Sequence, residues 1–370
     1  MNIYYYHPLD LSFKSAQTIQ VIKDYCSLSK KRHNIFIYGQ YSQISELEEV
    51  LKFTKDCSVS LSKYPKSKIN RMLSKFFFLV RMLKDKEKKI IITRDLDKAK
   101  SMVACRKIMR AKIVHEMHEE SFSYLFKRRV TKESVLAIFS KVDAILFTNQ
   151  SQVIFYEQEF GSQPYCHIVL PNGVEDGKFI NVKRKNNHVL TYLGQFNRWK
   201  NVELIFSSLA LLDDKYTLRV AGGKGVESDR NYINSLMEKY GIIKQRVNFL
   251  GFVDNNDITE KVLNESNVLL LPLGDNIQSK YLTSPMKLFE YMSTEIPIVS
   301  IDYPSIKSLV GEDIVFLSEN NPESFSRAIN KAASFIGIDS RVLNMNKKVK
   351  KLTYQARSER YNNFIAYLDK

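Results

Sequence analysis

The sequence predicts an α/β protein built from two doubly wound domains, each a parallel sheet flanked by helices. Short apolar runs typical of strands alternate with amphipathic helical segments along the chain. A length of 370 residues exceeds one average domain, and a hydrophobic content of 44% can fill two cores. We therefore expect a cleft between two domains, at the carboxyl ends of their strands.

Each half of the chain contains six candidate strands. In the first half they are IYYY, NIFIYG, KIIIT, KIVHEM, AILFTN and HIVLPNG, and in the second HVLTYLG, YTLRVAGG, VNFLGF, NVLLLPL, IPIVSID and DIVFLS. The polar stretch EDGKFINVKRKNNH between the two sets has no periodicity. We expect an N-terminal domain over 1–174, a linker over 175–188, a C-terminal domain over 189–350, and a helix over 351–370 that packs back toward the first domain.

Several classes of protein are disfavoured. No apolar run approaches the roughly 20 residues of a membrane span, and MNIYYYHPLD lacks the pattern of a signal peptide. The four cysteines are widely spaced, as expected for reduced thiols in the cytoplasm. The first strand is not followed by G-x-G-x-x-G, which argues against a dehydrogenase.

The positive charge is concentrated in the first half. Residues 1–170 hold 29 Lys and Arg against 17 Asp and Glu, which indicates an anionic partner. The segment 63–89 holds ten Lys and Arg residues. It also holds apolar residues at helical spacing, namely Ile69, Met72, Leu73, Phe76, Phe77, Val80 and Leu83. This pattern fits a basic amphipathic helix on an anionic membrane, and equally a helix packed on its own sheet. A nucleic-acid partner has only the charge in its favour, so we expect none.

The stretch LTSPMKLFEYM places one carboxylate, Glu290, in an apolar helical pattern. Ser284 can cap the helix, with Pro285 at its first position. The free N–H groups at such a helix start, together with Lys287 in the first turn, favour the binding of a diphosphate. Glu290 then lies one turn further, where a ribose would present its hydroxyls. Alternatively, Glu290 pairs with Lys287 on an exposed edge.

These residues resemble glycosyltransferase family 4, the group 1 type of retaining enzymes with the GT-B fold. SPMKLFEYMSTEIPIVS resembles the donor segment of that family, and five further matches follow the family order: IVHEMHEE, AILFTNQSQ, VLPNGVE, VLTYLGQFNRWKNVELIFSSLALL and VNFLGFV. The resemblance implies two Rossmann-like domains and a metal-independent transfer of sugar from a UDP- or GDP-linked donor to a hydroxyl of a glycan or lipid-linked acceptor. Together with the basic first half of the chain, the resemblance leads us to expect a role in cell-surface polysaccharide synthesis, with the enzyme peripheral on the inner face of the plasma membrane, and no cofactor.

The resemblance implies residue roles as well. His118, Lys200 and Glu290 match the catalytic positions: His118 beside the reacting sugar, Lys200 at the diphosphate with Arg198 as its neighbour, and Glu290 at the ribose. The remaining donor-binding positions are Gly251, Phe252 and Val253 at the base, and Ser284, Pro285, Met286 and Lys287 at the diphosphate. No metal site is expected.

The chain departs from the family pattern at two positions. Leu282 replaces a second glutamate that many members hold near the donor sugar, and Glu295 replaces a glycine, so we expect a different local turn. Two other functions stay open: a catalytically silent GT-B-like subunit that binds a membrane or partner enzyme, and a metal-dependent transferase that uses Asp95 and Asp97.

Overall fold

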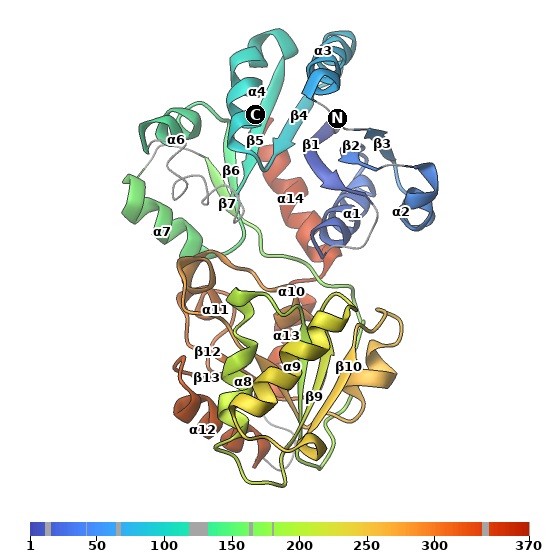
Figure 1. Ribbon diagram of the computed structural model, residues 1–370. Coiled ribbons are helices and arrows are strands. Elements are labelled where there is room, and N and C mark those ends of the chain that lie inside the picture. Colours follow the sequence, from blue (N-terminus) through green and yellow to red (C-terminus); the bar gives the residue numbers. More distant parts are fainter. Residues whose placement is uncertain are drawn as a thin grey trace. The chain divides into compact units, whose positions relative to one another are not determined.

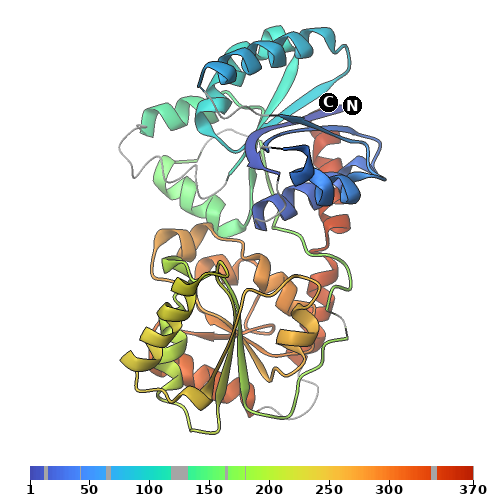
Figure 2. The same ribbon diagram turned by 45° about the vertical axis from the view of Figure 1, so that its right-hand side comes forward.

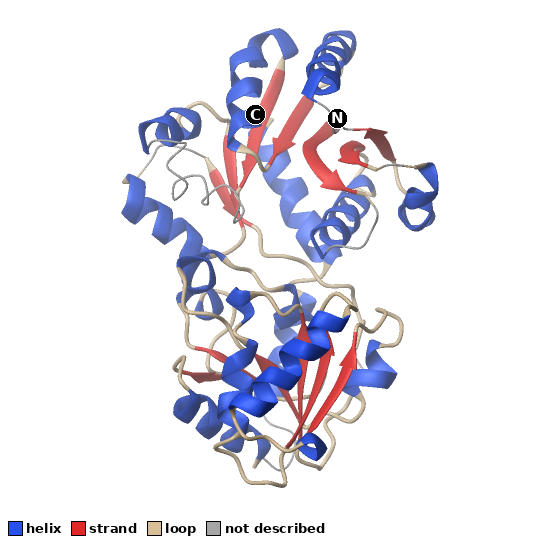
Figure 3. Cartoon of the chain, viewed as in Figure 1, coloured by secondary structure: helices blue, strands red, loops and turns tan. Residues whose placement is uncertain are grey.

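The computed structural model describes residues 1–11, 16–41, 43–63, 68–117, 132–162, 166–179, 181–334 and 340–369. The chain forms two compact units, Met1–Gly173 with Thr353–Lys370, and Val174–Leu352. Each unit is a sheet with helices on its faces (Figures 1 and 3).

The sheet of the first unit has seven parallel strands in the order β3-β2-β1-β4-β5-β6-β7. Its strands are rich in Ile, Val and Tyr because helices cover both faces of a parallel sheet. They are β1 (Asn2–Asp10), β2 (Asn34–Gln40), β3 (Val59–Lys63), β4 (Lys89–Thr93), β5 (Ala111–Glu116), β6 (Ala144–Phe147) and β7 (His167–Val169). The order reverses between β1 and β4, as in a doubly wound fold.

Seven helices of the described residues belong to this unit, with a 3₁₀ turn at Ile44–Leu47. They are α1 (Ala16–Ser29), α2 (Glu48–Thr54), α3 (Lys68–Lys84), α4 (Leu96–Met109), α6 (Lys132–Phe139), α7 (Gln150–Phe160) and α14 (Tyr354–Leu368). Helix α14 packs beside α1 although more than 300 residues separate them in the sequence (Figures 1 and 2).

The second sheet has six parallel strands in the order β10-β9-β8-β11-β12-β13. The strands are β8 (Val189–Gly194), β9 (Thr217–Gly222), β10 (Val247–Gly251), β11 (Val268–Leu271), β12 (Ile298–Ile301) and β13 (Phe316–Ser318). The helices are α8 (Val202–Leu209), α9 (Glu227–Lys239), α10 (Met286–Met292), α11 (Pro304–Lys307), α12 (Pro322–Ala333) and α13 (Ser340–Lys350). Short helical turns add Arg198–Lys200, Lys244–Arg246, Thr259–Leu263 and Gln278–Leu282.

The prediction of two parallel α/β units is confirmed. The division falls within two residues of the predicted boundaries at 174 and 350, and the last helix belongs to the first unit. Residues 175–188, predicted as a linker, lie within the second unit, because their backbone is bonded to it. Glu295 donates its N–H to Val182, and Lys185 donates its N–H to Ser266. The cleft between the domains stays a prediction.

Helix α3 has the predicted position but packs through an unexpected face. Phe78 and Met82 are buried, and the ring of Phe78 lies 4.3 Å from that of Tyr6. The predicted apolar face is instead largely exposed: Leu73 (53% exposed), Phe76 (61%), Phe77 (65%) and Leu83 (55%). The side chains of Ile69 and Met72 lie outside the described part of the chain. None of the described helices combines the length and the hydrophobicity that crossing a bilayer requires.

Candidate functional site

The candidate site lies where the strand order of the second sheet reverses. Strand β8 pairs with β9 on one side and β11 on the other, so the chain leaves their carboxyl ends in opposite directions. Ligands of doubly wound sheets bind at this position. The two departing loops contact each other here, since Gly274 N–H donates to Trp199 O at 2.8 Å. The first of these loops carries Lys200, and the second leads to α10.

The carboxyl ends of β8 and β9 are brought together by two glycines. Gly194 pairs with Gly222, and Gly223 N–H donates to Gly194 O at 3.1 Å. Gly222 has φ +130°, and a Cβ there would lie 1.8 Å from Gly194 O. No side chain fits at this position, so this edge of the sheet presents bare backbone.

Helix α10 begins one residue later than predicted. Pro285 has φ −69° and ψ 118°, which is an extended backbone, so it occupies the N-cap and not the first helical position. Pro285 has no side-chain acceptor and makes no side-chain cap, and Ser284 lies one residue before the N-cap, buried. The capping role of Ser284 stays a prediction. Met286 and Lys287 form the first turn, both half-buried.

Glu290 is a buried carboxylate held between two lysines. Its Oε1 accepts from Lys178 Nζ at 3.0 Å, and its Oε2 forms a short ion pair with Lys287 Nζ. The i,i+3 pair with Lys287 therefore exists as the alternative interpretation expected, but not on an exposed edge: the Glu290 side chain is 11% exposed. The two lysine side chains are more open, at 19% and 26%. The carboxylate is therefore more deeply buried than either of the lysines that hold it.

The two ammonium groups keep Glu290 ionised. Burial alone would raise the pKa of this carboxyl, but the charges and hydrogen bonds of Lys287 and Lys178 lower the pKa to about 2. At neutral pH Glu290 is therefore an acceptor only. Such a group binds vicinal hydroxyls by accepting hydrogen bonds from both.

The neighbouring residue in α10 fixes the helix to the sheet. Tyr291 is buried, and its hydroxyl accepts from Leu193 N at 3.0 Å, next to the carboxyl end of β8. The β8–β11 pairing covers only Leu190 and Thr191 of β8, so the N–H of Leu193 lies beyond it and takes Tyr291 as its acceptor. Because Glu290 and Tyr291 are adjacent, the bond sets the position of the carboxylate relative to β8.

Lys200 lies in the 3₁₀ turn after β8, half-buried and partnered, with its N–H bonded to Asn197 O at 2.8 Å. The turn follows the strand at the order reversal, as expected for a diphosphate-binding position. The side chain of Arg198 lies outside the described part of the chain.

The predicted base-binding loop follows β10, two strands from β8. Gly251 has φ +70°, the left-handed region that glycine adopts without strain. Phe252 is 58% exposed, and a Cβ on Gly225 would lie 3.3 Å from its Cβ, so this loop lies against the loop after β9. Val253 is half-buried against the core of the unit. An exposed aromatic ring is thus available beside the glycine-rich edge.

The remaining predicted residues belong to the first unit. His118 lies outside the described residues. Glu116, at the carboxyl end of β5, forms a buried bidentate pair with Arg94 at 3.0 and 3.1 Å. Asp95 caps α4 by accepting from Lys98 N–H, and Asp97 is exposed in the first turn of the same helix. Asp95 therefore has a structural role in helix α4.

Two features of the site have no counterpart in the sequence patterns. Lys178 comes from the predicted linker and reaches Glu290 across 112 residues of sequence. Glu295, which stands at the glycine position of the family, has no positive φ and bonds to the same segment through Val182. The expected difference in this turn is thereby confirmed. Leu282, at the position of the missing glutamate, is a buried core residue.

Comparison with known proteins agrees with this geometry. Residues 174–357, which include the whole second unit, match the family model "Glycosyl transferases group 1". No match was found among curated proteins.

Solved structures match over the whole chain at low sequence identity. HepE of Anabaena in complex with UDP and glucose is 13% identical, with 99% of this chain and 100% of that chain covered and a TM-score of 0.71. The lipopolysaccharide outer core galactosyltransferase WaaB is 17% identical, with 99% of both chains covered and a TM-score of 0.72. A glycosyltransferase of Rickettsia africae is 14% identical, with 98% and 97% covered and a TM-score of 0.75. The chain is therefore a glycosyltransferase of the GT-B fold, with the group 1 domain at residues 174–357.

Proposed function

We propose that this glycosyltransferase moves a sugar, with retention at the anomeric carbon and without a bound metal, from a UDP- or GDP-linked donor to a hydroxyl of a glycan or lipid-linked acceptor. The observation that carries the proposal is Glu290, an ionised and buried carboxylate between Lys178 and Lys287 at the strand-order reversal. A ribose places two hydroxyl donors on such a carboxylate, and the attached diphosphate extends toward the cations of the two loops.

The chemistry requires stabilisation of the leaving diphosphate. The bond between the anomeric carbon and the phosphate oxygen breaks, and the acceptor oxygen forms the new bond on the same face. The departing phosphate oxygen takes the proton of the acceptor hydroxyl. Lys200 and Lys287 supply positive charge where negative charge develops, which lowers the barrier. Because α10 has only seven residues, Lys287 contributes more positive potential than the helix dipole.

The exposed face of α3 supports a location on a membrane, where the acceptor would be lipid-linked and the product a surface polysaccharide. The helix carries exposed apolar side chains and several Lys and Arg residues. An anionic bilayer offers apolar acyl chains to the former and negatively charged headgroups to the latter. We propose that this face enters the headgroup region at the inner side of the plasma membrane.

A panel of nucleotide sugars tests the enzymatic proposal without knowledge of the acceptor. One UDP- or GDP-sugar should raise the melting temperature of the protein and be slowly hydrolysed, in the presence of EDTA as well. Proton NMR of the released sugar, read before mutarotation, should show the anomer of the donor. Hydrolysis that requires added Mn²⁺ would contradict the metal-independent mechanism, and the opposite anomer would contradict retention.

A further inference from the structure

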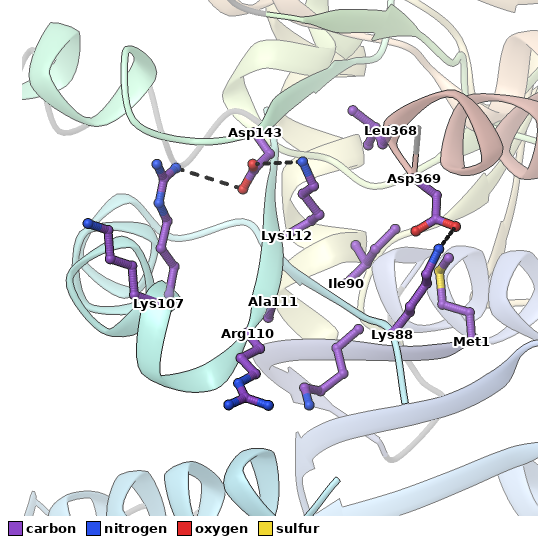
Figure 4. A pocket seen from close by; sticks show the side chains of 12 residues that line it. Met1, Lys88, Ile90, Lys107, Arg110, Ala111, Lys112, Asp143, Leu368 and Asp369 are labelled. Atoms are coloured by element: carbon purple, nitrogen blue, oxygen red, sulfur yellow. Dashed lines mark hydrogen bonds and ion pairs between the residues drawn. The ribbon is translucent and has the colours of Figure 1, made fainter. Parts of the chain in front are cut away.

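A cavity of about 400 Å³ lies at the amino ends of β4 and β5 in the first unit, at the sheet edge opposite Glu116 (Figure 4). The end of α4, the end of α14 and Met1 complete its wall. Its volume is within the range of sites for small ligands. Neither the donor site of the second unit nor the carboxyl ends of this sheet contribute to it.

The cavity wall is strongly cationic. Two carboxylates, Asp143 and Asp369, face six cations: Lys88, Lys89, Arg106, Lys107, Arg110 and Lys112. Lys88 pairs with Asp369 at 2.7 Å, and Lys112 with Asp143 at 3.6 Å. Figure 4 shows these pairs on two sides of the cavity, with Ile90 between them. A net positive charge remains after both acids are paired.

Lys107 and Arg110 are the cations without a protein counter-charge. Neither side chain makes a hydrogen bond or an ion pair with any residue that the structure describes. Both lie at the end of α4, where a cation is stabilised by the helix dipole. The dipole does not account for Lys88, Lys89 and Lys112, which line the same cavity at the starts of two strands, although Lys89 Nζ donates to Asp85 O.

We propose that this cavity binds a phosphate ester, a phosphate group attached to a small organic body. An arginine guanidinium can hold two phosphate oxygens at once, and lysines add point charges around them. The apolar side chains of Ile90 and Leu368 line the same cavity and offer contact to the organic part. The phosphate ester can be a soluble metabolite or the headgroup of a phospholipid.

The experiment uses the full-length protein and three probes: glycerol 3-phosphate, inorganic phosphate, and vesicles of phosphatidylcholine with or without phosphatidylglycerol. Calorimetry measures the soluble probes, and co-sedimentation measures the vesicles. The variant Lys107→Gln/Arg110→Asn removes both unpaired charges, and Asn accepts the left-handed backbone of Arg110 (φ +51°). The control Lys52→Gln/Lys55→Gln removes two exposed charges elsewhere in the same unit.

If the ligand is a soluble phosphate ester, glycerol 3-phosphate should bind more tightly than inorganic phosphate. The variant should weaken the binding of glycerol 3-phosphate about tenfold or more, and the control should not change it. If the ligand is a lipid headgroup, the variant should lose binding only to the vesicles that contain phosphatidylglycerol. Loss in the variant also distinguishes this cavity from the phosphate-binding position of the second unit. Equal binding by variant and wild type, binding of no probe, or inorganic phosphate bound as tightly as its ester would each overturn the proposal.

Discussion

Lys178 Nζ lies 3.0 Å from Glu290 Oε1, and this contact joins the first residues of the second unit to helix α10, which begins after the loop at the strand-order reversal. The Glu290 side chain is 11% exposed and the Lys178 side chain 19%, so the lysine holds the carboxylate from a partly buried position. Lys178 is therefore a positioning residue in our account. It keeps the Glu290 carboxylate ionised and fixes its orientation, and we assign this carboxylate to the donor ribose.

Replacing Lys178 with Met should raise the pKa of Glu290, because one of the two charges that oppose the effect of burial is removed. Affinity for the nucleotide diphosphate should then decline at a higher pH than in the wild type, as Glu290 becomes protonated. Calorimetric titrations between pH 4 and pH 8 measure this shift. Lys183→Met, at an exposed position of the same segment, is the matched control and should leave the pH profile unchanged.

Glu290 should also make stability depend on pH in the acid range. Its folded pKa of about 2 is below the ordinary value of 4.5, so its contribution is complete above about pH 4.5 and is lost as the pH falls toward 2. Wild type and Glu290→Gln should therefore differ in unfolding free energy at pH 6, with a smaller difference at pH 3. Urea unfolding at the two pH values gives both differences. A constant difference would mean that Glu290 is not held as an ion.

Tyr291→Phe removes the hydroxyl that accepts from Leu193 N–H and keeps the ring in the core. A buried N–H left without an acceptor costs about 1–3 kcal/mol, so the second unit should lose that much unfolding free energy. Tyr240→Phe is a matched control, since the part-buried hydroxyl of Tyr240 donates to the side chain of Glu203, which is 44% exposed, and no backbone N–H of the described residues is bonded to it. Equal losses of unfolding free energy in the two variants would show that the bond between Tyr291 and Leu193 stabilises the unit no more than a surface hydrogen bond does.

Gly222→Ala should prevent correct folding of the second unit, because the added Cβ overlaps Gly194 O at 1.8 Å. The Cβ position is fixed by the backbone and Gly194 O is itself a backbone atom, so no side-chain rotation can relieve the overlap. Soluble yield and circular dichroism report the effect. Gly241→Ala is the control: Gly241 also has a positive φ (+62°), but no atom lies within 4 Å of its added Cβ, so only backbone strain of about 1 kcal/mol is expected.

Phe76→Ser/Phe77→Ser should reduce sedimentation with anionic vesicles, because it removes exposed apolar area from α3 without touching Phe78. The melting temperature should hardly change. Leu211→Ser/Ile243→Ser removes exposed apolar residues from the second unit and should leave vesicle binding intact. Unaltered binding by the α3 variant would contradict the proposed membrane contact.

The strands were predictable because parallel strands that are buried on both faces appear as continuous apolar runs. All twelve predicted strands exist, and the strand missed, β3, is a half-exposed edge strand with alternating serines. The orientation of α3 was not predictable. Apolar residues occur on more than one side of this helix, so periodicity alone could not identify Phe78 and Met82 as its packing face.

The site was predictable only in part. Glu290 stood out as a lone carboxylate in an apolar helix, and Lys200 as a cation at a helix start. Lys178 had no such signal, since a lysine in a polar stretch without periodicity is ordinary, and its partner is 112 residues away. The N-cap also differed: proline fixes φ but not ψ, and the ψ of 118° at Pro285 is extended, which the sequence pattern does not specify.

The most direct test of the central claim is calorimetric binding of UDP and GDP to the wild type, Glu290→Gln and the control Glu295→Gln. We predict that one nucleotide binds the wild type and the control alike, and that Glu290→Gln weakens it at least tenfold, since an ionised acceptor for the ribose hydroxyls is lost. Undiminished binding by Glu290→Gln, with its fold intact, would contradict the assignment of this carboxylate to the donor.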